Sequence, residues 1–316
     1  MKRKSLIIFI LLLVFVCRVT AQYDAQLSNY WAMPAYYNPG YAGRSGKLEV
    51  TILNRQQWIG FENAPKTMLI TGDMPVKFFD RTFGVGLLVI SESLGLFNHS
   101  NVSLQATFKK KLWKGDLSLG LQLGMINESF DGIKVRKIEG DDYHEAEDEG
   151  IPTIVASGST IDFGLGLFYS KKSWYAGFSI THLLEPEMKM TERNYMDLPR
   201  GYYLMGGYNI QLNNPLLELQ PSFFVKSTIQ MTQLDVSIRL IYNNLLWGGL
   251  GWRMDDAAIV MIGGQYKNIQ AGYAYDFPIS AIWIGSTGSH EIFLKYSTDL
   301  DLGKGKKNKH KSVRIL

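Results

Sequence analysis

The chain has 316 residues, of which 46% are hydrophobic and 13% aromatic, with 33 Lys and Arg, 29 Asp and Glu and a single Cys. This apolar and aromatic content excludes a disordered chain, and one cysteine excludes a disulfide scaffold or a thiolate metal cluster. The mean hydropathy of −0.06 is too low for a bundle of membrane helices, whereas a closed β-barrel, whose strands are only half apolar, stays allowed.

Residues 1–21 have the pattern of a secretory signal peptide. Basic residues at positions 2–4 precede an apolar run from Leu6 to Val16, and small or tolerated residues then lead to a cleavage site after Ala21. The run is shorter than the ~20 residues of a spanning helix, so an uncleaved anchor is the weaker alternative. A lipoprotein at Cys17 is disfavoured because Phe15 and Val16 are too bulky for that cleavage pattern.

Cleavage after Ala21 removes four cations and the only cysteine, which leaves 29 basic and 29 acidic residues. The mature chain is then formally neutral, and its basic pI belongs mostly to the targeting segment. Nucleic acid therefore loses its support as a partner.

Residues 22–47 form an aromatic-rich arm that Pro34, Pro39 and Gly43 prevent from being a regular strand or helix. Asn38, Pro39 and Gly40 are typical of a tight turn. We expect the arm to lie on the periplasmic side or in the lumen of a barrel and to pack its aromatic residues against the wall. These residues are Tyr30, Trp31, Tyr36 and Tyr37.

From Leu48 onward, apolar and polar residues alternate with a period of two, which indicates β-strands. In one run Val102 and Leu104 share a face, while Asn101 and Gln105 lie on the other. The alternation predicts fourteen strands of about ten residues each. They are expected at residues 48–58, 66–74, 82–91, 99–110, 115–125, 161–169, 174–181, 200–212, 216–227, 233–243, 245–254, 257–266, 268–276 and 289–297.

Residues 48–297 are therefore predicted to form an all-β fold, a transmembrane antiparallel β-barrel of about 14 strands. Strands of ten residues match the ~9–11 needed to cross a bilayer at a tilt, whereas soluble strands centre near 5–6. One face carries Gly, Ser, Thr, Asn and Gln, which suits a lumen. The other carries Leu, Val, Ile and Phe with Tyr or Trp near strand ends, as an aromatic girdle requires. A soluble secreted β-sandwich is the alternative.

Barrels of this kind have short periplasmic turns and longer external loops. If the first strand starts in the periplasm, residues 170–173, 213–215 and 243–244 are short periplasmic turns. The long connections at residues 127–159 and 183–199 are then external. Residues 228–231 and 255–256 are short external connections, so the rule holds only in part.

The longest external connection includes an acidic segment with no Lys or Arg between positions 138 and 150. On the cell surface it could bind divalent cations that bridge lipopolysaccharide, or a basic partner. It lacks the ligand spacing of an EF-hand, which favours a solvated acidic loop. The candidate residues are Asp141, Asp142, Glu145, Glu147, Asp148 and Glu149.

Residues 298–316 form a basic tail that we expect in the periplasm. It could contact anionic lipid headgroups or a partner lipoprotein linked to peptidoglycan, and a disordered solubilising tail is equally compatible with the sequence. Its cations are Lys304, Lys306, Lys307, Lys309, Lys311 and Arg314.

The sequence predicts no catalytic residue, cofactor or metal site. None of the five histidines lies in an HExxH or GxSxG setting, and the mature chain has no cysteine to act as a nucleophile. His182 and His290 share the parity of the apolar face, so we expect them at the membrane interface. The chain is not expected to be an enzyme.

Four segments occur in order in the first third of the mature chain: SNYW…YYNPGYAG (28–43), NRQQWIGFENAPKT (54–67), GDMPV (72–76) and FGVGLLVISESLG (83–95). As a set they resemble the PorP/SprF family of outer-membrane proteins of the type IX secretion system. Beyond about residue 100 the resemblance depends on length and strand pattern. The motif residues singled out are Asn38, Pro39, Gly43, Arg55, Gln57, Trp58, Gly60 and Pro65.

The resemblance implies a fourteen-stranded outer-membrane barrel that takes part, without enzymatic activity, in export or surface attachment of proteins with a C-terminal sorting domain. It implies other secretion components as partners, including periplasmic lipoproteins, besides the outer-membrane lipids. A passive porin or small-solute transporter is the alternative function.

Strand parity places Arg55 and Gln57 inward and Trp58 outward at a strand end. Arg55 can then pair with a carboxylate in the lumen, and we expect the Asn38 turn to dock nearby. The motif is therefore predicted to join plug to wall rather than to contact cargo.

Overall fold

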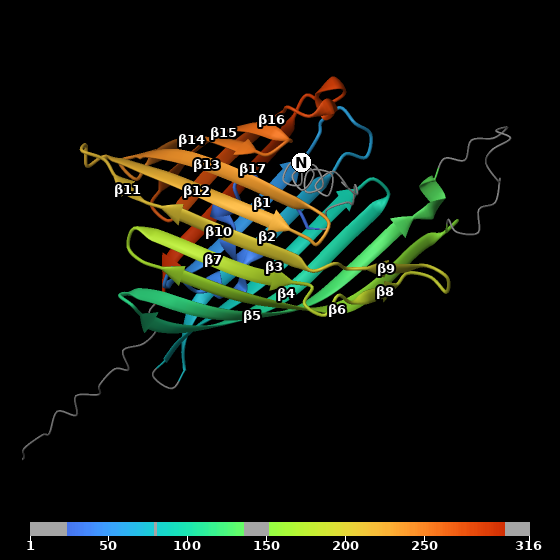
Figure 1. Ribbon diagram of the computed structural model, residues 1–316, viewed down its shortest axis with the longest axis horizontal. Coiled ribbons are helices and arrows are strands. Elements are labelled where there is room, and N and C mark those ends of the chain that lie inside the picture. Colours follow the sequence, from blue (N-terminus) through green and yellow to red (C-terminus); the bar gives the residue numbers. More distant parts are fainter. Residues whose placement is uncertain (1–23, 79–80, 136–151, 301–316) are drawn as a thin grey trace, which may run out of the picture.

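The computed structural model describes residues 24–78, 81–135 and 152–300, and these form a closed antiparallel barrel of fourteen strands (Figure 1). Each strand pairs with the next along the chain, and β1 pairs with β17 to close the barrel. The short β11 (Ile210–Gln211) continues β10 and pairs with β12. The other strands are β1 (Lys47–Gln56), β2 (Lys66–Phe78), β3 (Arg81–Leu94), β4 (Phe97–Leu112), β5 (Gly115–Asp131), β6 (Val155–Ser170), β7 (Trp174–Thr181), β10 (Gly201–Tyr208), β12 (Leu217–Ser227), β13 (Thr232–Tyr242), β14 (Leu246–Arg253), β15 (Ala257–Tyr266), β16 (Ile269–Pro278) and β17 (Ser289–Asp299).

The alternation of side chains follows the predicted faces. On β4, Val102 and Leu104 are 50% and 62% exposed on the outside, whereas Asn101 and Gln105 are buried inside. The exposed apolar exterior and the β1–β17 closure exclude the soluble sandwich, whose apolar faces would pack on each other. The predicted transmembrane barrel is confirmed. Among the described residues, no helix is both long and apolar enough to cross a membrane.

The strand connections differ at the two ends of the barrel. At the short-turn end, strands are joined by two to five residues, as at residues 113–114, 171–173 and 212–216. The long-loop end carries residues 57–65, 182–200 and 279–288, together with the described residues 132–135 and 152–154 that follow β5 and precede β6. Short helices lie in two of these loops, η3 (Gly132–Lys134) and η4 (Ala281–Ile284), and residues 182–200 contain the hairpin of β8 (Glu187–Lys189) and β9 (Tyr195–Asp197).

The strands β5 and β6 run further than the sequence predicted. The expected connection at residues 127–159 is shortened to residues 132–154, because Asp131 pairs with Val155. Outward residues explain the difference: Met125 and Ile161 form the last apolar pair, and the next outward pair is Asn127 with Ser159. The alternation of outward apolar residues ends at this pair, although the hydrogen-bonded ladder continues to Asp131 and Val155.

The N-terminal arm fills the lumen. It enters at the long-loop end at Asp24 and leaves at the short-turn end, where β1 begins at Lys47. Three short helices break it, η1 (Tyr30–Ala32), α2 (Pro34–Tyr37) and η2 (Pro39–Tyr41). Its apolar side chains form one buried cluster with inward side chains of the strands, so the core of this barrel lies between the arm and the wall.

Candidate functional site

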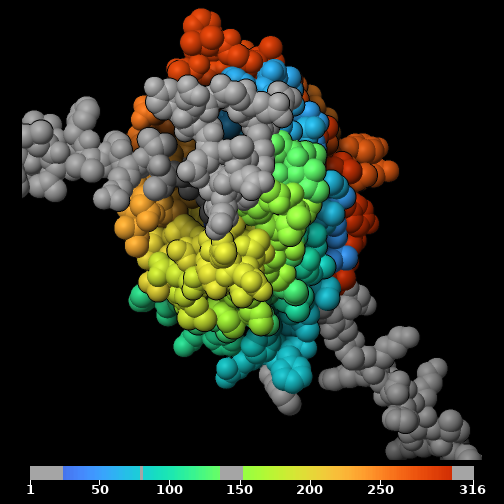
Figure 2. Space-filling view, turned by 90° about the vertical axis from the view of Figure 1, so that its right-hand side faces the viewer, coloured from blue at the N-terminus to red at the C-terminus, as the bar shows by residue number. Residues whose placement is uncertain are grey.

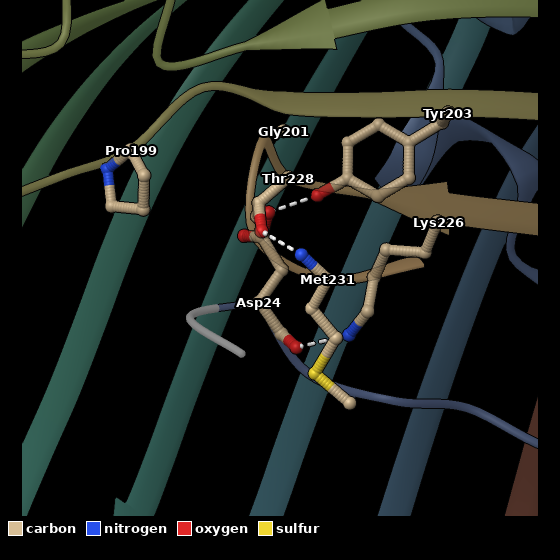
Figure 3. A pocket seen from close by; sticks show the side chains of 7 residues that line it. All are labelled: Asp24, Pro199, Gly201, Tyr203, Lys226, Thr228 and Met231. Atoms are coloured by element: carbon tan, nitrogen blue, oxygen red, sulfur yellow. Dashed lines mark hydrogen bonds between the residues drawn. The ribbon is translucent and has the colours of Figure 1, made fainter. Parts of the chain in front are cut away.

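The start of the arm is held at the long-loop mouth by Asp24 (Figure 3). Tyr203 of β10 donates a hydrogen bond to its carboxylate, and the Lys226 ammonium donates one to its backbone carbonyl at 2.7 Å. His182 lies on the other side, with Nε2 3.5 Å from the Asp24 carboxylate and Nδ1 3.2 Å from that of Asp162. This cluster fixes the arm to three parts of the wall.

His182 lies inside the barrel and not at the membrane interface, so the sequence prediction for it is wrong. It follows the end of β7 with a φ of 50°, in the left-handed region, and its side chain is 2% exposed. This backbone conformation interrupts the alternation, and a residue with outward parity therefore turns inward. His290 keeps its outward parity, is half-buried and bonds the Tyr273 hydroxyl at 2.6 Å.

The two carboxylates of this cluster favour the protonated, cationic form of His182. Burial alone lowers the pKa of His182, but the carboxylates of Asp24 and Asp162 outweigh burial and raise the pKa to about 10. Burial likewise opposes ionisation of Asp24, yet attraction to His182 and hydrogen bonds from His182 and Tyr203 hold its pKa well below the usual value.

We expect the stability contributed by His182 to be fully present below its unfolded pKa of 6.5 and lost as the pH rises to about 10. The reason is that only the folded chain keeps this proton across that window. Denaturant unfolding of the wild type and of His182→Gln, compared at pH 6 and pH 10, measures the stability that His182 contributes. The difference in the free energy of unfolding between wild type and His182→Gln should be smaller at pH 10 than at pH 6. An equal difference at both pH values would contradict the raised pKa of His182. Asp24 stays ionised throughout.

The middle of the arm is tied to a buried charge network. Arg55 of β1 contacts Asp276 at 2.7 Å and Glu291 at 3.2 Å. Arg253 contacts the same Asp276 and also Asp235, each at 2.8 Å. Both guanidinium groups are at most 1% exposed, so the carboxylates neutralise cations that water does not reach.

The arm completes this network through Ser28 and Asn29. The Ser28 hydroxyl donates to Asp276 at 2.6 Å and accepts from Arg55 at 2.8 Å. The backbone N–H groups of Ser28 and Asn29 donate to Glu291 at 2.8 and 2.6 Å. Charge-assisted bonds of this kind are stronger than neutral ones, so the network fixes the arm in register.

Aromatic contacts flank the network. Trp31 packs edge-on against Trp247 and Phe293, with the Arg239 guanidinium 3.3 Å from its ring centroid. Tyr30 and Tyr37 pack on Phe224, with centroid distances of 5.3 and 4.3 Å. The aromatic residues expected to pack on the wall therefore do so within the lumen.

The turn at Asn38, Pro39 and Gly40 docks on β4 to β7 and not near Arg55, where the sequence analysis expected it. The Asn38 amide donates to the backbone carbonyls of Leu167 and Phe178 and accepts from Gly40 N–H at 2.8 Å. The reason is a surface of glycines: a Cβ at Gly120 would overlap the backbone of Pro39 and Gly40, and one at Gly166 would overlap Asn38. The close approach of the turn therefore depends on the glycines in this part of the wall.

The arm leaves the lumen through Gly43. Its N–H donates to the Asp73 carboxylate at 2.6 Å and its carbonyl accepts from the Lys109 ammonium. The backbone has a φ of +64°, and a Cβ on this residue would come within 3 Å of backbone atoms of Met74 and Gly84. Both features require glycine here.

The other motif residues join two external loops and line the mouth. Gln57 N–H donates to the Pro65 carbonyl at 2.9 Å, which closes the β1–β2 loop. Trp58 N–H donates to the Ser289 hydroxyl at 3.1 Å, and Gly60, with a φ of +119°, packs on the Gly285 carbonyl. Gln57, Trp58 and Pro65 line a cavity of about 380 Å³ that Asp24, Ala25 and Gln26 of the arm also line. Figure 2 views the molecule from this long-loop end.

Several sequence predictions fall on residues that the structure does not describe. They are the signal peptide (1–21), the acidic loop (Asp141, Asp142, Glu145, Glu147, Asp148 and Glu149) and the tail cations (Lys304, Lys306, Lys307, Lys309, Lys311 and Arg314).

Most members of the buried network around Arg55 were not predicted from the sequence. Ser28, Asp276, Glu291 and Arg253 were not singled out, although all three charged residues have inward parity. A charge at an inward position of a barrel strand is the signal that could have found them.

Comparison with protein families gives a match to "Type IX secretion system membrane protein PorP/SprF" over residues 19–296. No curated protein matches the chain. Solved structures match at low identity. Acinetobacter baumannii outer membrane protein Omp33 is 7% identical, with a TM-score of 0.47 over 80% of this chain and 99% of that one. A Pseudomonas aeruginosa FadL homologue is 10% identical, with a TM-score of 0.44 over 80% and 89%.

These structural similarities concern the barrel fold alone. The family match spans the arm, the buried network and all fourteen strands, and the exposed apolar exterior places the barrel in the outer membrane. The chain therefore belongs to the PorP/SprF family and is an outer-membrane barrel component of the type IX secretion system.

Proposed function

We propose that this barrel is a non-enzymatic adaptor in the export or surface attachment of proteins with a C-terminal sorting domain. The observation that carries the proposal is the filled lumen. The arm lies in the lumen from Asp24 to Gly46 and is bonded to β1, β10, β16 and β17. A barrel of fourteen strands is narrow, and with the arm inside it no polypeptide can pass.

A passive porin is the second candidate and is less favoured. The cavity of about 380 Å³ lies at the long-loop end, and the first residues of the arm are part of its lining. Further along the arm, Tyr36 and Tyr37 belong to the buried cluster that joins arm and wall, and Trp31 packs against this cluster. Conduction through this lumen requires the arm to move.

The short-turn end supports a periplasmic partner. Lys110, Lys111, Lys114 and Lys172 are exposed there, and Lys171 lies over the rings of Tyr169 and Trp174. Basic and aromatic side chains at this edge suit anionic lipid headgroups or an acidic protein surface. The tail cations add charge of the same sign after β17.

An affinity pull-down from gently solubilised envelopes tests the proposal. We expect the tagged barrel to recover periplasmic lipoproteins or sorting-domain proteins. A chain that lacks residues 303–316 should lose the lipoproteins if the basic tail makes that contact, since the deletion removes the six cations of the tail. A barrel recovered alone would contradict the adaptor role and favour the porin.

A further inference from the structure

The loop that joins β16 to β17 exposes apolar side chains at the long-loop end. Trp283 and Ile284, in the short helix η4, are 65% and 80% exposed, and Ile279 before them is exposed as well. We call these three residues the η4 patch. Residues 277–289 contain no Asp, Glu, Lys, Arg or His, whereas the external residues 182–200 carry both acids and bases. Exposed apolar side chains gathered in this way mark a surface that contacts a membrane or another protein.

The η4 patch continues the membrane-facing wall of the barrel. Along β16 the outward side chains Tyr273, Tyr275 and Phe277 lead directly to the loop. Tyr275 and Phe277 pack edge-on with their ring centroids 4.5 Å apart. On the neighbouring β15, the outward Val260 pairs with Tyr275 and Ala258 with Phe277. The exterior of these two strands is therefore apolar or aromatic up to the residue at which β16 ends.

Other strands become polar before their loops begin. On β5 and β6 the outward residues beyond Met125 and Ile161 are Asn127 and Ser159. β16 has no such polar interval, because Ile279 follows Phe277 with the same spacing and is also exposed. The loop after β16 therefore starts within the apolar surface of the barrel.

The base of the loop is fixed on the outer face. The Tyr275 hydroxyl donates to the Thr287 carbonyl, and the Tyr273 hydroxyl bonds His290 at 2.6 Å. Tyrosine rings of this kind, with an apolar body and a bonded hydroxyl, are enriched where a barrel meets the membrane–water interface. Figure 2 shows the orange-red residues of the loop at the outer rim of the barrel, at the top of the view.

The β1–β2 loop holds the η4 loop in place. Ile59 N–H donates to the Gly288 carbonyl at 2.9 Å, and Thr287 N–H donates to the Ile59 carbonyl at 2.8 Å. The Phe61 ring packs over Gly285, where a Cβ would lie 2.6 Å from Cζ of the ring. The loop is thus ordered without a partner, which lowers the entropic cost of any contact that the patch makes.

We propose that the η4 patch enters the outer leaflet of the outer membrane and contacts lipid acyl chains at the headgroup boundary. Continuity with the wall favours lipid over a protein partner, because the bilayer that covers Val260 and Phe277 adjoins the patch. A loop without charges avoids the cost of moving a charge into this layer. Trp283 suits the boundary, where an indole can keep its N–H hydrated. The contact does not depend on the adaptor role.

A fluorescent probe at position 284 tests the inference. A chain that begins at residue 22 has no cysteine, so Ile284→Cys carries a single bimane label. The matched control is Glu192→Cys, in the exposed turn between β8 and β9. In phosphatidylcholine nanodiscs, we expect lipid brominated near the start of the acyl chain to quench the label at 284 about threefold or more strongly than the label at 192. Aqueous iodide should quench the two labels in the opposite order.

Tryptophan fluorescence gives a readout without a label. If Trp283 lies in lipid, Trp283→Ser should lower the fraction of tryptophan emission that brominated lipid quenches. Equal iodide quenching at positions 284 and 192 would overturn the lipid contact and leave the patch to a protein partner. A quenched fraction in Trp283→Ser that equals or exceeds that of the wild type would overturn it as well.

Discussion

Arg253→Ala is expected to lower the free energy of unfolding by about 3–5 kcal/mol, because it leaves buried carboxylates without their cation. Arg253 is 0% exposed and is the ion-pair partner of Asp235, while it shares Asp276 with Arg55. Removing the guanidinium also removes a hydrogen-bond donor to the Ser28 hydroxyl. The substitution therefore weakens the attachment of the arm to the wall as well as the wall itself. Denaturant unfolding of the refolded barrel in detergent micelles measures the change.

Arg200→Ala is the matched control. Arg200 pairs with Glu185 at 3.4 Å, but both side chains are about 40% exposed, and exposed pairs contribute about 0–1 kcal/mol. A second substitution, Asp235→Asn, should restore part of the stability of Arg253→Ala. If Arg253→Ala and Arg200→Ala lower the free energy of unfolding by the same amount, the buried network does not stabilise the barrel.

Removal of residues 24–44 is expected to convert a closed barrel into a conducting one. The arm contributes Tyr30, Tyr36 and Tyr37 to the buried cluster, and each fully buried large side chain contributes ~1.5–3 kcal/mol. Their loss should lower the free energy of unfolding by about 5 kcal/mol or more. It should also leave an interior lined by Thr51, Thr71, Ser103 and similar polar residues, which water can fill.

A milder variant keeps the arm but displaces its turn. Gly120→Val with Gly166→Val places side chains where Pro39 and Gly40 now lie. The added side chains should either lower the free energy of unfolding by about 1–3 kcal/mol or push the turn at Pro39 and Gly40 away from the wall. Gly72→Val is the control, since the nearest atom to its Cβ position is 3.9 Å away. We expect partial conduction from the double variant and none from the control.

The sequence predicted the barrel because strand residues obey a simple rule. Side chains two apart face the same way, and the bilayer demands apolar residues on one face alone, so Val102 and Leu104 could be assigned outward without a structure. The rule failed at His182, because a left-handed residue at a strand end breaks the alternation. It also failed at the ends of β5 and β6, where the outward residues become polar.

The buried site was predictable only in part. The inward position of Arg55 follows from strand parity, but its partners Asp276 and Glu291 are more than 200 residues away. They meet only because β17 returns to pair with β1, and their register depends on every strand between. The Asn38 turn shows the same limit. The turn docks against the glycines of β5 and β6, where the absence of a side chain lets its backbone come close. The sequence alone does not show that these glycines face the turn.

Planar-bilayer conductance tests most directly whether the arm closes the lumen. We would record the wild-type barrel, the chain without residues 24–44, the Gly120→Val and Gly166→Val double variant, and Gly72→Val. The filled lumen predicts no stable conductance from the wild type and the control, an open channel from the deletion and intermediate opening from the double variant. A wild-type barrel that conducts as well as the deletion variant would contradict closure of the lumen by the arm.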